Sequence, residues 1–212
     1  MTRSSVRREL GLSEGNLVVG MVARVDPQKD HSTLLAAADS LLKEHPQLRF
    51  ILIGKSTETI EAKGFLCLGE RVDVSRLIKA FDIAVLCSAY GEGFPNVVAE
   101  AMATELPCVV TDIGDAKLMI GDTGVAIPPK NPRALAEAIG RLISEGELKR
   151  RRRGRRARAI VLEKYGFERF LNQYVRLSYA LGAHGPVGDL EIYGATPEPA
   201  AAPPEGASAK IR

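Results

Sequence analysis

The 212-residue sequence lacks any run of about eighteen apolar residues, the length that a membrane-spanning helix requires. Its charged first residues, MTRSSVRREL, do not resemble a signal peptide. Together these absences lead us to expect a cytoplasmic protein. The formal net charge is only +3, too small by itself to indicate nucleic acid as a partner, and we expect none.

Metal-ligand patterns are also missing. The sequence has 3 cysteines, each in an apolar run and without the spacing of a metal site: Cys67, Cys87 and Cys108. We expect them to be buried thiols in a reducing compartment. No Asp-x-Asp pair or other dense cluster of carboxylates is present to hold a divalent cation. The sequence therefore predicts neither a metal nor another cofactor.

Apolar strands alternate with helices along most of the chain. Residues 17–24 form an apolar run without alternation, which is typical of a strand buried on both faces of a parallel sheet. Further strands are predicted at residues 49–54, 65–69, 83–87, 107–111 and 125–127. Helices are predicted at residues 30–44, 75–80, from Pro95, and at residues 131–144, 147–164 and 167–181. This order predicts an α/β fold with a Rossmann-like, doubly wound parallel sheet and C-terminal helices.

The same pattern divides the chain into three parts. We expect an N-terminal linker segment over residues 1–16 and a folded domain over residues 17–181. Residues 182–212 are rich in Gly, Pro and Ala with little to bury, which predicts a disordered tail.

The stretch CSAYGEGFPNVVAEAMA, which begins at Cys87, follows the fourth predicted strand. It has Gly91 and Gly93 but Asn96 where a dinucleotide fingerprint has its third glycine, so a nicotinamide site is not expected. Ligands of doubly wound sheets bind beyond the carboxyl ends of the strands. Pro95 can begin a helix there, and the positive helix end predicts an anion site, with phosphate as the expected ligand, at the amides of Phe94, Asn96 and Val97.

This stretch also contains two glutamates, Glu92 and Glu100, for which different partners are expected. Glu100 lies in an apolar run, so we expect it to be buried and to need hydrogen-bond donors. Two vicinal ribose hydroxyls would satisfy it, although a structural pair with an arginine is the alternative. Glu92 lies in the loop, where it would meet the group attached beyond the phosphates. The combination predicts a site for a nucleotide sugar.

Cations are predicted to come from the first strand. Arg24 and Lys29 flank a tight turn at its carboxyl end, from which both can reach a diphosphate. They would stabilise the leaving diphosphate without a metal. The alternative is that both are surface charges of a turn.

These motifs resemble the C-terminal, donor-binding domain of the retaining, GT-B fold glycosyltransferases of group 1, from Val18 to about Ile139. Glu92 and Glu100 match the family's Glu-x7-Glu signature, and Arg24 and Lys29 match its basic pair. The segment LGERVDV, which contains Arg71, resembles the part of the family near the nucleotide base. The resemblance implies catalytic roles for Glu92, Arg24 and Lys29, and substrate binding by Glu100, Arg71 and the segment from Gly91 to Val97.

The chain departs from the family at several points. Asp30 and Glu105 stand where glycine is common, and residues 55–64 are shorter than the family's usual helix. The N-terminal acceptor domain is absent, so we expect the chain to bind its donor but to transfer sugar poorly without that partner. The alternatives are a nucleotide-sugar-binding regulatory module and an epimerase of the GT-B kind.

The arginine-rich run at residues 149–158 has two interpretations. It is either the solvated face of a helix or a contact with an anionic membrane. Arg71 is likewise either a base-site residue or a solvated loop arginine.

Overall fold

The computed structural model describes residues 2–180 and divides the chain into two units, Met1–Phe170 and Leu171–Arg212. The second unit is described for residues 171–180 alone. The tail predicted for residues 182–212 lies outside the described residues. The first unit contains the whole sheet and all the candidate site residues.

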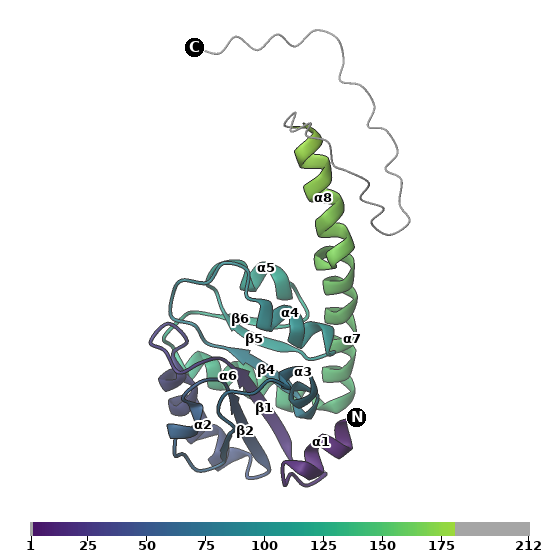
Figure 1. The fold of residues 1–212 in the computed structure, drawn as a ribbon. Coiled ribbons are helices and arrows are strands. Elements are labelled where there is room, and N and C mark those ends of the chain that lie inside the picture. The colour runs from purple at the N-terminus through teal and green to yellow at the C-terminus, as the bar shows by residue number, and fades with distance from the viewer. Residues whose placement is uncertain (1, 181–212) are drawn as a thin grey trace. The chain divides into compact units, whose positions relative to one another are not determined.

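The sheet is all-parallel and has six strands in the order β3-β2-β1-β4-β5-β6 (Figure 1). Their bounds are β1 Leu17–Val22, β2 Leu48–Ile53, β3 Phe65–Cys67, β4 Ile83–Leu86, β5 Cys108–Thr111 and β6 Val125–Ile127. The predicted fold class is therefore confirmed.

Helices cover both faces of this sheet, as buried strands require. One face packs against α2 (His31–Glu44) and α6 (Pro132–Ser144). The other packs against α1 (Arg3–Glu9), α3 (Val74–Leu77), α4 (Asn96–Ala103), α5 (Ala116–Ile120) and α7 (Gly146–Tyr165). Short 3-10 turns occur at η1 (Thr57–Thr59) and η2 (Ile78–Ala80), and α8 (Phe167–Ala180) crosses from the first unit into the second. No helix in the described part is long and apolar enough to cross a bilayer.

The position of the site follows from the strand order. β1 lies between β2 and β4, with Val19 opposite Ile83 and Gly20 opposite Ala84. The chain leaves β1 toward α2 on one face and leaves β4 toward α4 on the other. The loops after β1 and β4 therefore diverge at the carboxyl edge, which is where doubly wound sheets bind ligands.

The segment predicted as a linker contains α1, and this helix is anchored on the sheet. Val6 has no exposed surface. Asp82, just before β4, accepts hydrogen bonds from the guanidinium groups of Arg3 and Arg7, each at 2.5 Å, and from the amide of Val18 at 2.8 Å. One carboxylate thus joins α1 to the amino ends of β1 and β4.

Helix α7 packs closely on the turn between α4 and β5. Glu105 in this turn has a φ of 64°, in the left-handed region that favours glycine. A Cβ atom on Gly154 of α7 would lie 1.7 Å from the carbonyl oxygen of Glu105. Only glycine therefore permits the observed approach of the helix.

We predict that Gly154→Ala destabilises the protein by about 1–3 kcal/mol, because the backbone oxygen of Glu105 leaves no room for a methyl group. Urea unfolding followed by circular dichroism would measure the change. Gly140→Ala in α6 is the matched control, since its nearest neighbour would be a Leu41 methyl at 4.0 Å. That control should gain about 0.5–1 kcal/mol from helix propensity. A similar gain in stability in Gly154→Ala would contradict the close packing of Gly154 on the carbonyl of Glu105.

Candidate functional site

The loop after β1 is a tight turn held by its own side chains. Oδ1 of Asp26 accepts a hydrogen bond from the amide of Gln28 at 2.8 Å, and this bond lowers the pKa of Asp26. Nε of Arg24 donates to Asp26 at 3.3 Å, but the arginine side chain is 56% exposed. An exposed pair of this kind is weak, so the Arg24 guanidinium is available to a ligand.

Asp30 ends this loop in the left-handed conformation, with a φ of 48° and a ψ of 53°. The residue that replaces the family's glycine therefore keeps the glycine-like backbone. Its carboxylate caps α2, accepting hydrogen bonds from the amide of Thr33 at 3.2 Å and from the hydroxyls of Ser32 and Thr33, each at 2.6 Å. Aspartate tolerates this backbone and adds a cap that glycine lacks.

The β1 loop and the β4 loop are joined by hydrogen bonds. Nε2 of Gln28 donates to the carbonyl of Gly91 at 2.7 Å, and the amide of Ala89 donates to the carbonyl of Gln28 at 2.7 Å. Gly91 has a φ of 71°, so the β4 loop turns there through a conformation that favours glycine. The two loops that were predicted to share a ligand therefore form one unit.

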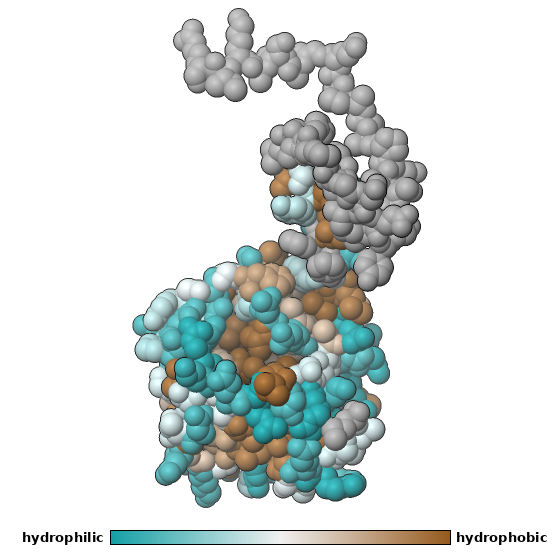
Figure 2. Space-filling model, viewed as in Figure 1, coloured by the Kyte–Doolittle hydropathy of each residue, from teal (hydrophilic) through white to brown (hydrophobic). Residues whose placement is uncertain are grey.

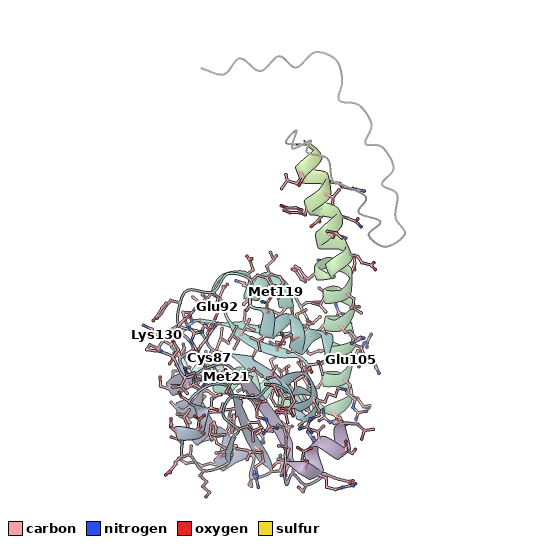
Figure 3. The ribbon with its side chains drawn as sticks, viewed as in Figure 1. Met21, Cys87, Glu92, Glu105, Met119 and Lys130 are labelled. Atoms are coloured by element: carbon pink, nitrogen blue, oxygen red, sulfur yellow. The ribbon has the colours of Figure 1, made fainter. Side chains whose placement is uncertain are left out.

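Lys29 and Glu92 form an ion pair across the two loops, from positions 63 residues apart. Their side chains are 17% and 8% exposed, so the pair is largely withdrawn from water. The hydroxyl of Ser88 donates to the same oxygen, Oε1 of Glu92, at 2.5 Å. Figure 3 shows Glu92 among the loops at the carboxyl edge of the sheet, with Cys87 nearer the strands.

Helix α4 begins at this loop with unpaired amides. Pro95 occupies the position before the helix and makes no side-chain cap. The amides of Phe94, Asn96 and Val97 donate no hydrogen bond within the described part of the chain. A Cβ atom on Gly93 would meet nothing within 4 Å, so the space in front of the helix is open. These amides are therefore free to donate to a ligand, and an anion bound to them remains a prediction.

The mouth of the site carries apolar groups. The Phe94 ring is 42% exposed and contacts the ring of Tyr165 edge-on at 5.2 Å between centroids. A small cavity between the sheet and α4, about the size of one water molecule, is lined largely by apolar side chains that include Val22, Val97 and Val110. Figure 2 shows apolar atoms in a hollow in this part of the first unit, with hydrophilic atoms around it.

Glu100 is exposed, which corrects the prediction that it is buried. The run around it is apolar in sequence, but at helical spacing only Val98, Ala101 and Met102 are fully buried, and the other apolar residues pack partly against the core. Glu100 lies on the opposite side, one turn from the start of the helix. It needs no internal partner, and its carboxylate is open to a ligand at the same edge as Glu92.

Arg71 lies in the loop before α3 and is 41% exposed. Its guanidinium makes two hydrogen bonds to the carboxylate of Asp73, at 2.9 and 3.2 Å. The guanidinium groups of Arg71 and then Arg76 lower the pKa of Asp73 well below its usual range. Asp73 stands just before α3, but its side chain makes no cap there and binds these two arginines instead.

The cysteines and His31 are buried or partly buried, and of these Cys87 touches the β1 loop, where its thiol donates to the carbonyls of Lys29 and Asp30 at 3.6 and 3.3 Å. Cys87 and Cys108 are buried, which raises the pKa of each thiol to about 12, and Cys67 is partly buried. His31 is buried at the start of α2, where desolvation lowers its pKa and neither ring nitrogen has a hydrogen-bond partner in the described structure. Among the described residues, no three His, Cys, Asp or Glu side chains are grouped to hold a metal ion.

The structure brings together most of the predicted residues. Lys29 and Glu92 meet directly, the amides at the start of α4 follow Glu92 in the same loop, and Arg24 lies on the adjoining turn. Sequence reasoning missed two contacts, those of Ser88 with Glu92 and of Gln28 with Gly91. The contact of Ser88 with Glu92 could have been suspected from the sequence, because Ser88 stands just after a strand and four residues before the glutamate.

An all-parallel sheet of this order, with an acidic and a basic loop joined at its switch point, defines a Rossmann-like domain of the GT-B class. The model of the family described as "Glycosyl transferases group 1" matches residues 16–145. The chain belongs to the group 1 glycosyl transferase family.

Individual relatives agree with this assignment. A D-inositol 3-phosphate glycosyltransferase of Nocardia farcinica is 30% identical over 169 residues, covering 70% of this chain and 38% of that protein. The Escherichia coli UDP-Gal:alpha-D-GlcNAc-diphosphoundecaprenol alpha-1,3-galactosyltransferase is 32% identical over 124 residues, covering 52% and 32%. Among solved structures, Anabaena HepE in complex with UDP-glucose has a TM-score of 0.74 and 25% identity, covering 84% of this chain and 52% of that one. The chain spans about a third to a half of the length of these proteins.

We predict that Glu100→Ala changes the free energy of unfolding by no more than about 0.5 kcal/mol, because the side chain is exposed and has no internal partner. Met102→Ala in the same helix is the comparison, since Met102 has no exposed surface and should cost about 2–5 kcal/mol. Urea unfolding of both variants measures the contrast. If Glu100→Ala lowered the free energy of unfolding by more than about 2 kcal/mol, the Glu100 carboxylate would have to be buried, as the sequence suggested.

Proposed function

We propose that this chain is the donor-binding domain of a glycosyltransferase and binds a nucleoside-diphosphate sugar at the carboxyl edge of its sheet. The observation that carries the proposal is the contact of Lys29 with Glu92 beside the unpaired amides of α4. Cations and amide donors for a diphosphate thus stand next to a carboxylate acceptor for sugar hydroxyls. The complex of the relative HepE with UDP-glucose supports a nucleotide sugar as the ligand class.

The diphosphate is assigned to Arg24, Lys29 and the amides of Phe94, Asn96 and Val97. A helix N-terminus and a fork of guanidinium donors both favour phosphate oxygens. The same groups would stabilise the negative charge that develops on the diphosphate as the glycosyl bond breaks. We therefore propose transfer without a metal ion or other cofactor.

The two glutamates have different partners in this proposal. Glu100 accepts hydrogen bonds from the ribose hydroxyls, and its exposure on α4 leaves both carboxylate oxygens free for them. Glu92 lies in the loop beyond the phosphates and accepts from the sugar. Arg71 is assigned to the nucleotide base, which requires part of its pairing with Asp73 to be exchanged for the ligand.

Transfer with retention to an acceptor is proposed from the family resemblance, with acceptor recognition in an N-terminal domain as partner. The chain alone should then bind the donor and transfer sugar poorly. A regulatory nucleotide-sugar sensor and a nucleotide-sugar epimerase share the same donor site. Incubation of the chain with UDP-glucose and analysis of the sugar by NMR separates the epimerase, because only that activity changes the free nucleotide sugar.

A cytoplasmic location with peripheral membrane contact is the second part of the proposal, and the outer face of α7 supports the contact. Arg150, Gly154, Ala157 and Val161 form the buried stripe of this helix. On the opposite side, Arg152 and Arg155 are exposed between Leu148 and Leu162, which are 84% and 58% exposed. Neither arginine has an ion pair within the described part of the chain. Basic residues between exposed leucines suit an anionic lipid surface.

We predict that Glu92→Gln does not weaken UDP binding, because the substitution releases Lys29 from its ion pair before the diphosphate arrives. The same variant should lose about 1.5–3 kcal/mol for UDP-glucose relative to UDP, since the sugar loses a charged acceptor. Glu100→Gln should weaken both ligands by a similar amount, because both contain the ribose. Isothermal titration calorimetry measures the four affinities. Lys29→Ala is the reference that should weaken both ligands through the diphosphate. Equal loss of UDP in the two glutamate variants would show that their roles are wrongly assigned.

We predict that the chain sediments with vesicles containing phosphatidylglycerol and not with vesicles of phosphatidylcholine. Arg152→Gln with Arg155→Gln should reduce binding roughly thirtyfold, at about 1 kcal/mol for each of the two basic residues. The matched control is Arg133→Gln with Arg141→Gln, which removes the same charge from exposed positions of α6. If both double variants lost the same amount of vesicle binding, the effect would come from net charge and not from a specific membrane-binding face of α7.

A further inference from the structure

The carboxylate of Glu92 is held from inside the protein by a buried hydroxyl. Ser88 follows β4 and has no exposed surface, and its Oγ donates to Oε1 of Glu92 at 2.5 Å. The ammonium group of Lys29 contacts this same oxygen. Oε1 therefore has one partner fixed at the end of the sheet and one on a long, rotatable side chain.

The position of Ser88 is set by two neighbouring strands. The hydroxyl of Thr111, the last residue of β5, donates to the carbonyl of Ser88 at 2.7 Å, and Thr111 is 1% exposed. The described residues offer the Ser88 hydroxyl no partner other than Glu92. Because an unsatisfied buried hydroxyl is costly, its bond to Glu92 should persist when the surroundings change.

We propose that Ser88 is a positioning residue that keeps Glu92 directed at the glycosyl group of the donor while Lys29 turns to the diphosphate. This inference rests on the proposed function of the site. When a diphosphate takes up the Lys29 ammonium, Glu92 loses its cationic partner and Ser88 becomes the group that holds Oε1. Oε2 of Glu92 accepts no hydrogen bond from the described residues, so it is the oxygen free to accept one from a sugar hydroxyl.

The test compares UDP with UDP-glucose in Ser88→Ala by isothermal titration calorimetry. The dissociation constant for UDP-glucose should rise about tenfold, the loss of roughly one hydrogen bond, and that for UDP should change less than about twofold. A general loosening of the loop would weaken both ligands, because the loop amides bind the diphosphate they share. Equal weakening of UDP and UDP-glucose, or no weakening of UDP-glucose, would overturn the positioning role.

A second comparison tests whether Ser88 acts through Glu92. In a Glu92→Ala background, Ser88→Ala should cause no further loss of UDP-glucose affinity, since the group to be positioned is gone. A further tenfold loss in that background would overturn the proposal. Ser88→Cys, which keeps a weaker donor of similar size, should lose less than Ser88→Ala and provides a second variant if the alanine protein folds poorly.

The control for removal of a buried hydroxyl is Thr123→Val. Thr123 is 1% exposed, and its hydroxyl donates to the carbonyl of Ile120 at 2.6 Å, away from the Glu92 network. In this variant the ratio of the affinities for UDP and UDP-glucose should equal that of the unaltered chain. If Thr123→Val changed this ratio as much as Ser88→Ala does, a specific role for Ser88 would be overturned. If the unaltered chain bound neither ligand, the proposed function would fall, and the role of Ser88 with it.

Discussion

The parallel register of β1 and β4 is the constraint on which the site depends. Because both strands end at the same edge while their chains leave toward opposite faces, the two following loops must lie side by side over an open edge. Gln28 and Gly91 then join these loops through a hydrogen bond. Residues from two distant parts of the sequence are thereby held in one place before any ligand arrives.

The ion pair of Lys29 and Glu92 is the electrostatic consequence of that register. Two opposite charges with little exposure would each be costly alone, and pairing satisfies both in the free protein. The same pair sets a condition on the ligand. An anion that takes up Lys29 must compensate for separating it from Glu92, which a diphosphate with several charged oxygens and the α4 amides can do.

Much of this architecture was predictable because it depends on local patterns. Uninterrupted apolar runs located the strands, and Pro132 after Asn131 located the start of α6, whose cap is formed by the Asn131 side chain. The distant pairing of Lys29 with Glu92 was not predicted as a direct contact, because sequence gives the edge on which residues lie but not their side-chain partners. Ser88 stands directly after a predicted strand, yet its bond to Glu92 depends on the turn of the loop through Gly91.

The error at Glu100 has a different physical cause. The run from Val97 to Ala103 is apolar in composition, and composition alone suggested a helix buried on all sides. A helix beside a sheet buries only the stripe that faces it, and the α4 stripe contains Val98, Ala101 and Met102.

Exposure changes the argument for Glu100 as a ligand residue, a role that stays a prediction. A buried carboxylate would have required internal donors, and these would compete with a ribose for the same oxygens. An exposed carboxylate at the sheet edge where Glu92 also lies loses only its hydrogen bonds to water when a ligand binds. The exposed position of Glu100 therefore leaves it better suited to bind a ligand than the buried position that the sequence suggested.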